Sequence, residues 1–326
     1  MDDIIHGANP ENLYHAFGIS MPENIIDFST NTNILSWPEI HIDIRRLASN
    51  YPDPECTPLR EIISARENIS PSRVLFTSGI NSAIFILAQI FSEGTAILQP
   101  CYTEYARAFR NAQNVFTLNE AGRFRHFIIC NPNNPTGIFI PDISRTIAAN
   151  PDTVFMIDEA YIDFLTRSKP ERLYYFSNVI ILRSLTKIFH LSGARIGYVI
   201  ASESIISAMK ELLPSWSVNA FAQELALKFL VDGEFYAMTR DFYRVNTPAF
   251  MDSLRGAGFD VMDSDVHYFL VKVKNDIEAV KHLLRRGIAV RHTRNFPGLC
   301  GKYIRIATRK PCENEILIEA MKEVLS

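Results

Sequence analysis

Short apolar runs alternate with amphipathic stretches along the first part of the chain. Runs typical of buried strands occur at residues 73–77, 95–99, 115–118, 126–130, 153–157 and 178–182. The stretch at 81–91 predicts a helix directly after the first run. Because strands that alternate with helices usually form a parallel sheet covered by helices, this pattern indicates an α/β fold.

The pattern changes after Gly197, where long amphipathic stretches follow one another. They predict helices at 203–213, 220–230 and 235–255, then a strand at 268–274 and a helix at 276–286. A chain of 326 residues is long enough for two domains. We expect a large domain at 46–235 and a small carboxyl-terminal domain at 236–326, with an amino-terminal arm at 1–45 that forms part of the small domain and of the substrate site.

Composition and charge exclude several classes of protein. The net charge is -3 and the pI is about 6.3, so no basic surface for nucleic acid is indicated. The first residues lack the features of a signal peptide, and no apolar run approaches the roughly 20 residues that span a bilayer. We therefore expect a cytoplasmic protein that binds neither nucleic acid nor membrane.

The cysteines indicate neither a disulfide framework nor a metal site. They are odd in number, widely spaced and free of any CxxC pair: Cys56, Cys101, Cys130, Cys300 and Cys312. We expect reduced thiols and no bound metal.

One lysine follows a strand-like run among hydroxyl groups and an arginine. Lys187 comes soon after the apolar residues 179–182, and Ser184, Thr186 and Arg195 lie near it in sequence. A partly desolvated lysine near positive charge loses its proton more easily and can form a Schiff base with an aldehyde cofactor. Hydroxyl and guanidinium groups can bind the phosphate of such a cofactor. The alternative is a solvated lysine of no special role.

Two polar motifs follow earlier strand-like runs. Asn131 opens the motif NPNNPTG, and Asp158 and Tyr161 belong to the motif DEAY. A carboxylate at the end of a buried strand can keep a pyridine nitrogen protonated, and the tyrosine and Asn131 can reach the phenolic oxygen of the same ring. Taken alone, the first motif could be a turn-rich loop and the second an acidic helix start.

Together these motifs resemble the aspartate aminotransferase superfamily, the class I/II pyridoxal-phosphate enzymes of fold type I, over nearly the whole chain. The resemblance implies a mostly parallel seven-stranded sheet sandwiched by helices, with a smaller α+β domain. It also implies pyridoxal 5′-phosphate bound to Lys187 in the large domain, and a homodimer. Family members place a tyrosine of the neighbouring subunit on the cofactor phosphate, and Tyr51 matches it.

The junction at 77–81 resembles the position where the family binds the cofactor phosphate. Gly79 allows close approach, and Ile80 and Asn81 donate from a helix start, which favours anions. Tyr102 matches the aromatic ring that stacks on the pyridine. An ordinary helix cap and a core tyrosine are the alternatives.

The amino-terminal motifs HGAN at 6–9 and DFSTNTN at 27–33 resemble those of threonine-phosphate decarboxylases, enzymes of cobalamin biosynthesis. That resemblance assigns His6 and Asn31 to the substrate phosphate. By the family pattern, Arg291 also takes this phosphate and Arg305 takes the α-carboxylate, since guanidinium groups bind both anions bidentately. Asn131 is included among the substrate contacts. The expected reaction is decarboxylation of L-threonine O-3-phosphate, or of L-serine phosphate, to an amino-alcohol phosphate.

Two alternatives remain open. A histidinol-phosphate-type aminotransferase would use the same residues, with Lys187 as the base at Cα. A non-catalytic regulator that binds the same cofactor is less favoured. Such proteins carry an added DNA-binding domain, and we expect none in this sequence. The segment 119–125 is also shorter than the helix-containing segment that relatives usually carry there, and its effect on function is open.

Overall fold

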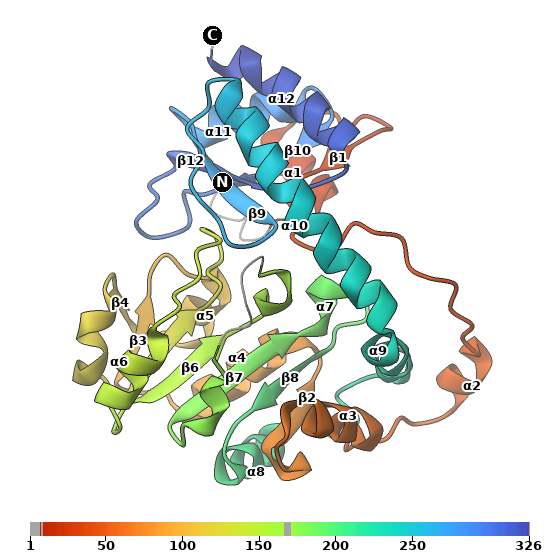
Figure 1. Cartoon of the computed structure of the whole chain (residues 1–326), viewed down its shortest axis with the longest axis vertical. Helices are drawn as coiled ribbons and strands as arrows, with labels where there is room; N and C mark the ends of the chain where they lie inside the picture. The colour runs from red at the N-terminus through yellow and green to blue at the C-terminus, as the bar shows by residue number, and fades with distance from the viewer. Residues whose placement is uncertain (1–6, 8, 166–170, 326) are drawn as a thin grey trace.

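A twisted seven-stranded sheet forms the larger part of the molecule in the computed structural model, which describes residues 7, 9–165 and 171–325 (Figure 1). The strand order is β2-β8-β7-β6-β5-β3-β4. Their bounds are β2 Val74–Thr77, β3 Thr95–Leu98, β4 Gln113–Val115, β5 His126–Cys130, β6 Val154–Asp158, β7 Val179–Ser184 and β8 Gly197–Ile200. All neighbouring pairs are parallel except those of β8, which runs antiparallel to β2 and β7. The predicted fold class is confirmed.

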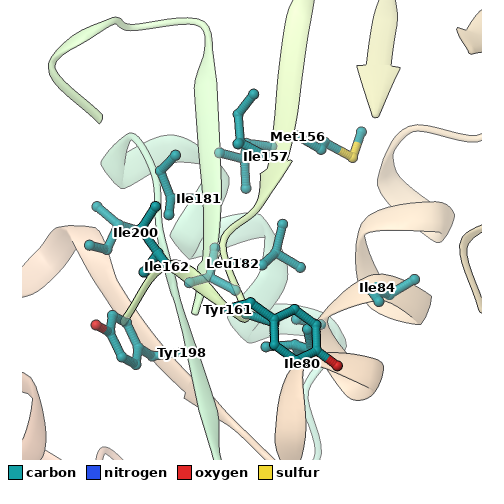
Figure 2. Close-up of a cluster of buried hydrophobic side chains, with 14 of the residues drawn as sticks. Ile80, Ile84, Met156, Ile157, Tyr161, Ile162, Ile181, Leu182, Tyr198 and Ile200 are labelled. Carbon is teal, nitrogen blue, oxygen red and sulfur yellow. The ribbon is translucent and has the colours of Figure 1, made fainter. Parts of the chain in front are cut away.

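Helices pack against this sheet and connect its strands. They are α3 Thr57–Glu67, α4 Gly79–Ile90, α5 Thr103–Ala108, α6 Ile143–Ala149, α7 Leu185–Ile188, α8 Glu203–Leu212 and α9 Ala220–Val231. Figure 2 shows part of the core, to which Ile157 and Ile181 contribute from the neighbouring strands β6 and β7 and Ile84 from α4. These central strands are nearly all apolar because both faces of the sheet are covered.

A second hydrophobic core lies in the smaller part of the molecule. It contains α11 Asp276–Leu284, α12 Pro311–Leu325 and the three-stranded sheet β11-β12-β9, formed by Arg291–His292, Tyr303–Ala307 and Tyr268–Lys272. Residues from near the amino terminus join it: α1 (Pro10–Phe17) contributes Leu13 and Tyr14, and β1 (Ile26–Asp27) pairs in parallel with β10 (Ile288–Ala289). The amino-terminal segment is therefore built into this second core.

One long helix connects the two cores. Helix α10 (Gly233–Gly256) begins where the Asp232 side chain accepts from the Phe235 N–H at 2.9 Å, which satisfies a free donor of the first turn. Its first half packs in the core of the large sheet and its second half in the other core (Figure 1). The expected boundary at 235–236 falls inside this helix, and we keep the three-part division as a proposal.

Some expected elements differ from those observed. The strand expected at 115–118 is β4, which ends at Val115. The Thr117 hydroxyl accepts from the Asn119 N–H and begins the 3-10 helix Leu118–Arg123, which fills most of the short segment 119–125. Strand β8 was missed. No helix of the described residues is long and apolar enough to cross a membrane.

Candidate active site

A cavity of about 160 Å³ lies where the carboxyl ends of the large sheet's strands meet the second core. In open α/β sheets this edge is where ligands bind. The lining residues come from three parts of the chain: Gly7, Ser29 and Asn31; Tyr102, Thr103, Asn134, Tyr161 and Lys187; and Arg291, Phe296 and Arg305. The cavity thus brings together side chains that lie nearly 300 residues apart in sequence.

Lys187 lies in α7, directly after β7, with its ammonium group 6.0 Å from the centre of the Tyr161 ring. Burial and the nearby charges of Arg305 and Arg195 together lower its pKa from 10.5 to about 8. Asp158 opposes this shift. Lys187 therefore has a larger fraction of neutral, nucleophilic amine near neutral pH than an exposed lysine has.

Asp158 is the last residue of β6 and is only 2% exposed. Its Oδ2 accepts from the Tyr105 hydroxyl at 3.0 Å, and its Oδ1 accepts from the Ala160 N–H at 2.9 Å. Burial raises the pKa of Asp158 from 3.8 to about 6, against the lowering effect of these two hydrogen bonds and of Lys187. The carboxylate is thus held in one orientation at the base of the site.

A tight approach between Gly79 and Arg195 forms a second feature beside Lys187. Gly79 has φ +68°, and a Cβ placed on it would lie 2.7 Å from the Arg195 guanidinium. Helix α4 begins here, so the amide groups of its first turn, at Ile80 and Asn81, are donors that the helix itself does not use. A guanidinium beside a helix start fits a phosphate group.

Tyr102, Asn31 and Tyr161 line the cavity, and further hydroxyl and amide groups belong to the segments next to them. The Ser184 and Thr186 hydroxyls lie 2.8 Å apart. The Tyr102 hydroxyl donates to Asn81 Oδ1 at 3.3 Å, and Asn31 Nδ2 lies 3.5 Å from the Tyr161 hydroxyl. Asn31 Oδ1 is buried without a hydrogen-bond partner in the described structure, and it is therefore available to a ligand.

The structure places Asn131 outside the cavity. Its side-chain amide donates to the Ile140 carbonyl at 3.1 Å, and its oxygen accepts from the Ile140 N–H at 2.8 Å, so its hydrogen-bonding groups hold the NPNNPTG loop together. Asn134 of the same motif lines the cavity instead and accepts a hydrogen bond from Arg305. The Asn131 side chain is thus engaged by the main chain, and Asn134 is the asparagine of this motif that lines the cavity.

Arg291 and Arg305 are directly opposite each other on the neighbouring antiparallel strands β11 and β12. Both are buried, at 3% and 6% exposure. Arg305 donates to the Ser29 carbonyl at 2.9 Å, and Arg291 donates to the His292 carbonyl and to Asn295 Oδ1, each at 3.0 Å. Burial and the nearby charge of Arg305 together lower the pKa of Arg291 to about 9, against the raising effect of Asp276.

Several other predicted site residues are not among those that line this cavity: Tyr51, Gly79, Ile80, Asn81, Asp158, Ser184, Thr186 and Arg195. Tyr51 is 82% exposed and packs against Trp216 with ring centres 4.7 Å apart. His6 lies outside the described residues. Gly7, which follows it, approaches Ser29 and Arg291 so closely that a Cβ would lie 2.8 Å from the Ser29 carbonyl. Within the described ranges, no group of three or more His, Cys, Asp and Glu residues could hold a metal ion.

The chain belongs to the class I and II aminotransferase family, whose sequence model matches residues 23–321. It is 28% identical to the threonine-phosphate decarboxylase of Salmonella typhimurium, over 98% of this chain and 96% of that protein. It is also 28% identical to a histidinol-phosphate aminotransferase of Caldicellulosiruptor saccharolyticus, over 85% of this chain and 84% of that one. A bifunctional adenosylcobalamin biosynthesis protein of Leptospira interrogans is 30% identical over 98% of this chain, which spans only 41% of that longer relative.

Solved structures agree with this family. The crystal structure of L-threonine-O-3-phosphate decarboxylase from Porphyromonas gingivalis is similar with a TM-score of 0.81 and 27% identity, over 92% of this chain and 99% of that one. The histidinol-phosphate aminotransferase of Sinorhizobium meliloti in complex with pyridoxal-5′-phosphate has the same fold, with a TM-score of 0.85 and 20% identity over 98% and 94% of the two chains.

As a member of this family, the chain uses pyridoxal 5′-phosphate as its cofactor. The residues present fit this group. Lys187 offers an amine of lowered pKa, Asp158 a buried carboxylate, and the Gly79–Arg195 approach an anion site with no room for a larger side chain.

The space at Gly79 gives a direct test of the phosphate site. We expect Gly79→Ala to weaken cofactor binding at least about tenfold, because the new methyl group displaces the Arg195 guanidinium and one charge-assisted contact is worth about 1.5–3 kcal/mol. Gly193→Ala is the matched control, since a Cβ there meets nothing within 4 Å. Fluorescence titration of the two apoproteins with pyridoxal 5′-phosphate measures the difference, and equal affinities would exclude this role for Arg195.

Proposed function

We propose that this chain decarboxylates a short phosphorylated amino acid, L-threonine O-3-phosphate or L-serine phosphate, to an amino-alcohol phosphate used in cobalamin biosynthesis. The observation that carries the proposal is the buried pair Arg291 and Arg305. Like charges directly opposite each other on paired strands repel, and burial increases the cost of each charge. A substrate with a carboxylate and a phosphate would neutralise both.

In this proposal Lys187 binds the aldehyde of the cofactor and Asp158 keeps its ring nitrogen protonated. Tyr161 and Asn134 contact the phenolic oxygen, and Tyr102 stacks on the ring. The cofactor phosphate lies against a further set: Gly79, Ile80, Asn81, Ser184, Thr186 and Arg195. When bound, the cofactor withdraws electrons from the bond that breaks at Cα.

The substrate groups divide between the two arginines. Arg305, fixed by the Ser29 carbonyl and Asn134, takes the α-carboxylate, and Arg291 with Asn31 takes the phosphate. His6 remains a predicted phosphate ligand. The cavity is small, about 160 Å³, and Phe296 lines it beside Arg291, with its ring centre 5.3 Å from the guanidinium carbon. The small volume favours a short substrate over histidinol phosphate with its imidazole.

A histidinol-phosphate-type aminotransferase is the second candidate. The observation that favours it is the lowered pKa of Lys187, about 8, which suits a base that moves a proton at Cα. The similarity to histidinol-phosphate aminotransferases, at 28% identity, equals that to the Salmonella decarboxylase. The two candidates differ in the bond broken and in the need for a 2-oxo acid acceptor.

Two parallel incubations separate these reactions. The protein loaded with cofactor is given carboxyl-labelled threonine phosphate alone, and in a second tube histidinol phosphate with 2-oxoglutarate. We expect labelled carbon dioxide and an amino-alcohol phosphate in the first tube and no glutamate in the second. Glutamate in the second tube without labelled gas from the first would establish the aminotransferase.

The assignment of Arg291 to the substrate phosphate has its own test. We expect Arg291→Ala to lower kcat/KM for threonine phosphate at least about tenfold, since one charge-assisted hydrogen bond contributes about 1.5–3 kcal/mol. Turnover of unphosphorylated threonine, where measurable, should change little. Arg285→Ala, an exposed position of the same part of the chain, is the control. An equal loss with both substrates would show that Arg291 does not bind the phosphate.

We also propose a cytoplasmic homodimer in which Tyr51 reaches the cofactor phosphate of the partner's site. Support comes from its exposure, 82%, on a side chain that does not line the cavity of its own chain. Mixing inactive Lys187→Ala subunits with Tyr51→Ala subunits should restore activity, because one site of each hybrid dimer is then intact. Mixtures that exchange subunits and stay at the activity of the separate variants would exclude this arrangement.

A further inference from the structure

Tyr105 lies behind the proposed cofactor site and has no place in the expected set of site residues. It belongs to α5, has an exposure of 0% and packs in the large hydrophobic core. Its hydroxyl nevertheless donates to Asp158 Oδ2 at 3.0 Å. A buried phenol in an apolar core needs such a partner, and here the partner is the carboxylate assigned to the cofactor ring.

We propose that Tyr105 is a positioning residue that keeps Asp158 ionised and correctly oriented for the ring nitrogen of pyridoxal 5′-phosphate. The geometry supports this directly. Tyr105 holds Oδ2 and the Ala160 N–H holds Oδ1, so each carboxylate oxygen has one fixed donor and the plane of the group is set. The proposal rests on the assignment of Asp158 to the ring nitrogen and is independent of which substrate is used.

The surroundings of Asp158 explain why a neutral donor is needed. Its carboxylate is coupled to one basic group, Lys187 of α7. The other ionisable groups coupled to it have pKa values that burial raises, so they are neutral near pH 7: Cys101, Tyr102, Tyr105, Cys130 and Tyr268. Lys187 is also the residue that binds the cofactor aldehyde, so its ammonium charge is not a permanent partner. The Tyr105 hydroxyl, in contrast, remains a hydrogen-bond donor to Asp158 whether or not the cofactor is bound to Lys187.

The direction of the hydrogen bond is also determined. Burial and the neighbouring Asp158 charge both raise the pKa of Tyr105 well above 10. The phenol therefore keeps its proton and acts as the donor to the carboxylate. A hydrogen bond to the ionised form lowers the pKa of the acceptor, which opposes the effect of burial on Asp158.

The test uses apoprotein, so that no reaction is required. Protonation of Asp158 is followed by the infrared band of its neutral carboxyl group, identified by its loss in Asp158→Asn. The wild-type midpoint is expected at about 6. Tyr105→Phe should raise this midpoint by about one pH unit or more, because it removes one hydrogen bond to a charged group.

Cofactor affinity gives a second measurement. Tyr105→Phe should bind pyridoxal 5′-phosphate more weakly than wild type at a pH between the two midpoints, and the difference should shrink well above both, where Asp158 is ionised in each protein. In the Asp158→Asn background the same substitution should have no effect on affinity, since Tyr105 acts through the carboxylate. A structural defect alone would produce neither dependence.

Tyr174→Phe is the matched control. Tyr174 is 1% exposed, and its hydroxyl donates to Glu67 Oε2 at 2.7 Å, away from the cavity. We expect it to leave both the Asp158 titration and the cofactor affinity unchanged. The proposal is overturned if Tyr105→Phe titrates and binds like wild type, if its effect persists in Asp158→Asn, or if Tyr174→Phe has the same effect. If Asp158→Asn binds the cofactor normally, the assignment of Asp158 itself is wrong.

Discussion

The burial of charge around one small cavity is the constraint on which the site depends. Asp158, Lys187, Arg291 and Arg305 are all removed from bulk water, and each pKa moves toward the neutral form: up for the acid and down for the three bases. Three of these four groups are bases, and this balance favours anions in the cavity. The fold creates this imbalance by placing the end of a parallel sheet against the strands that carry the two arginines.

The alternating part of the fold could be predicted from sequence because strands buried on both faces are continuous apolar runs. Strand β8 was missed because its four residues follow Arg195 in a left-handed conformation and lie within a glycine-containing segment. The pairing of β1 with β10 could not be predicted either. It joins two residues from near each end of the chain, and so short a pair leaves no periodic pattern in the sequence.

The sequence indicates a candidate site where a chemically suitable side chain follows the end of a strand-like run, as for Lys187 and Asp158. Within the NPNNPTG loop the sequence does not separate the three asparagines, because only the backbone path decides that Asn131 binds the main chain while Asn134 reaches Arg305. Tyr105 gave no separate signal, since a core tyrosine and a carboxylate partner have the same sequence pattern.

The two arginine anchors also bear on the choice of reaction. Their side chains start from directly paired residues of one ladder, whose Cα atoms are about 4.5–5.5 Å apart, so the two anion positions are close together and fixed relative to each other. In threonine phosphate, a carboxylate and a phosphate are separated by only a few bonds. A substrate held at both ends has little rotational freedom about Cα. The positions of the two arginines then determine which bond at Cα is oriented to break. Histidinol phosphate has one anion, so it would leave Arg305 with only its neutral partners, the Ser29 carbonyl and Asn134, and the paired arginines are better matched by a single substrate that carries both charges.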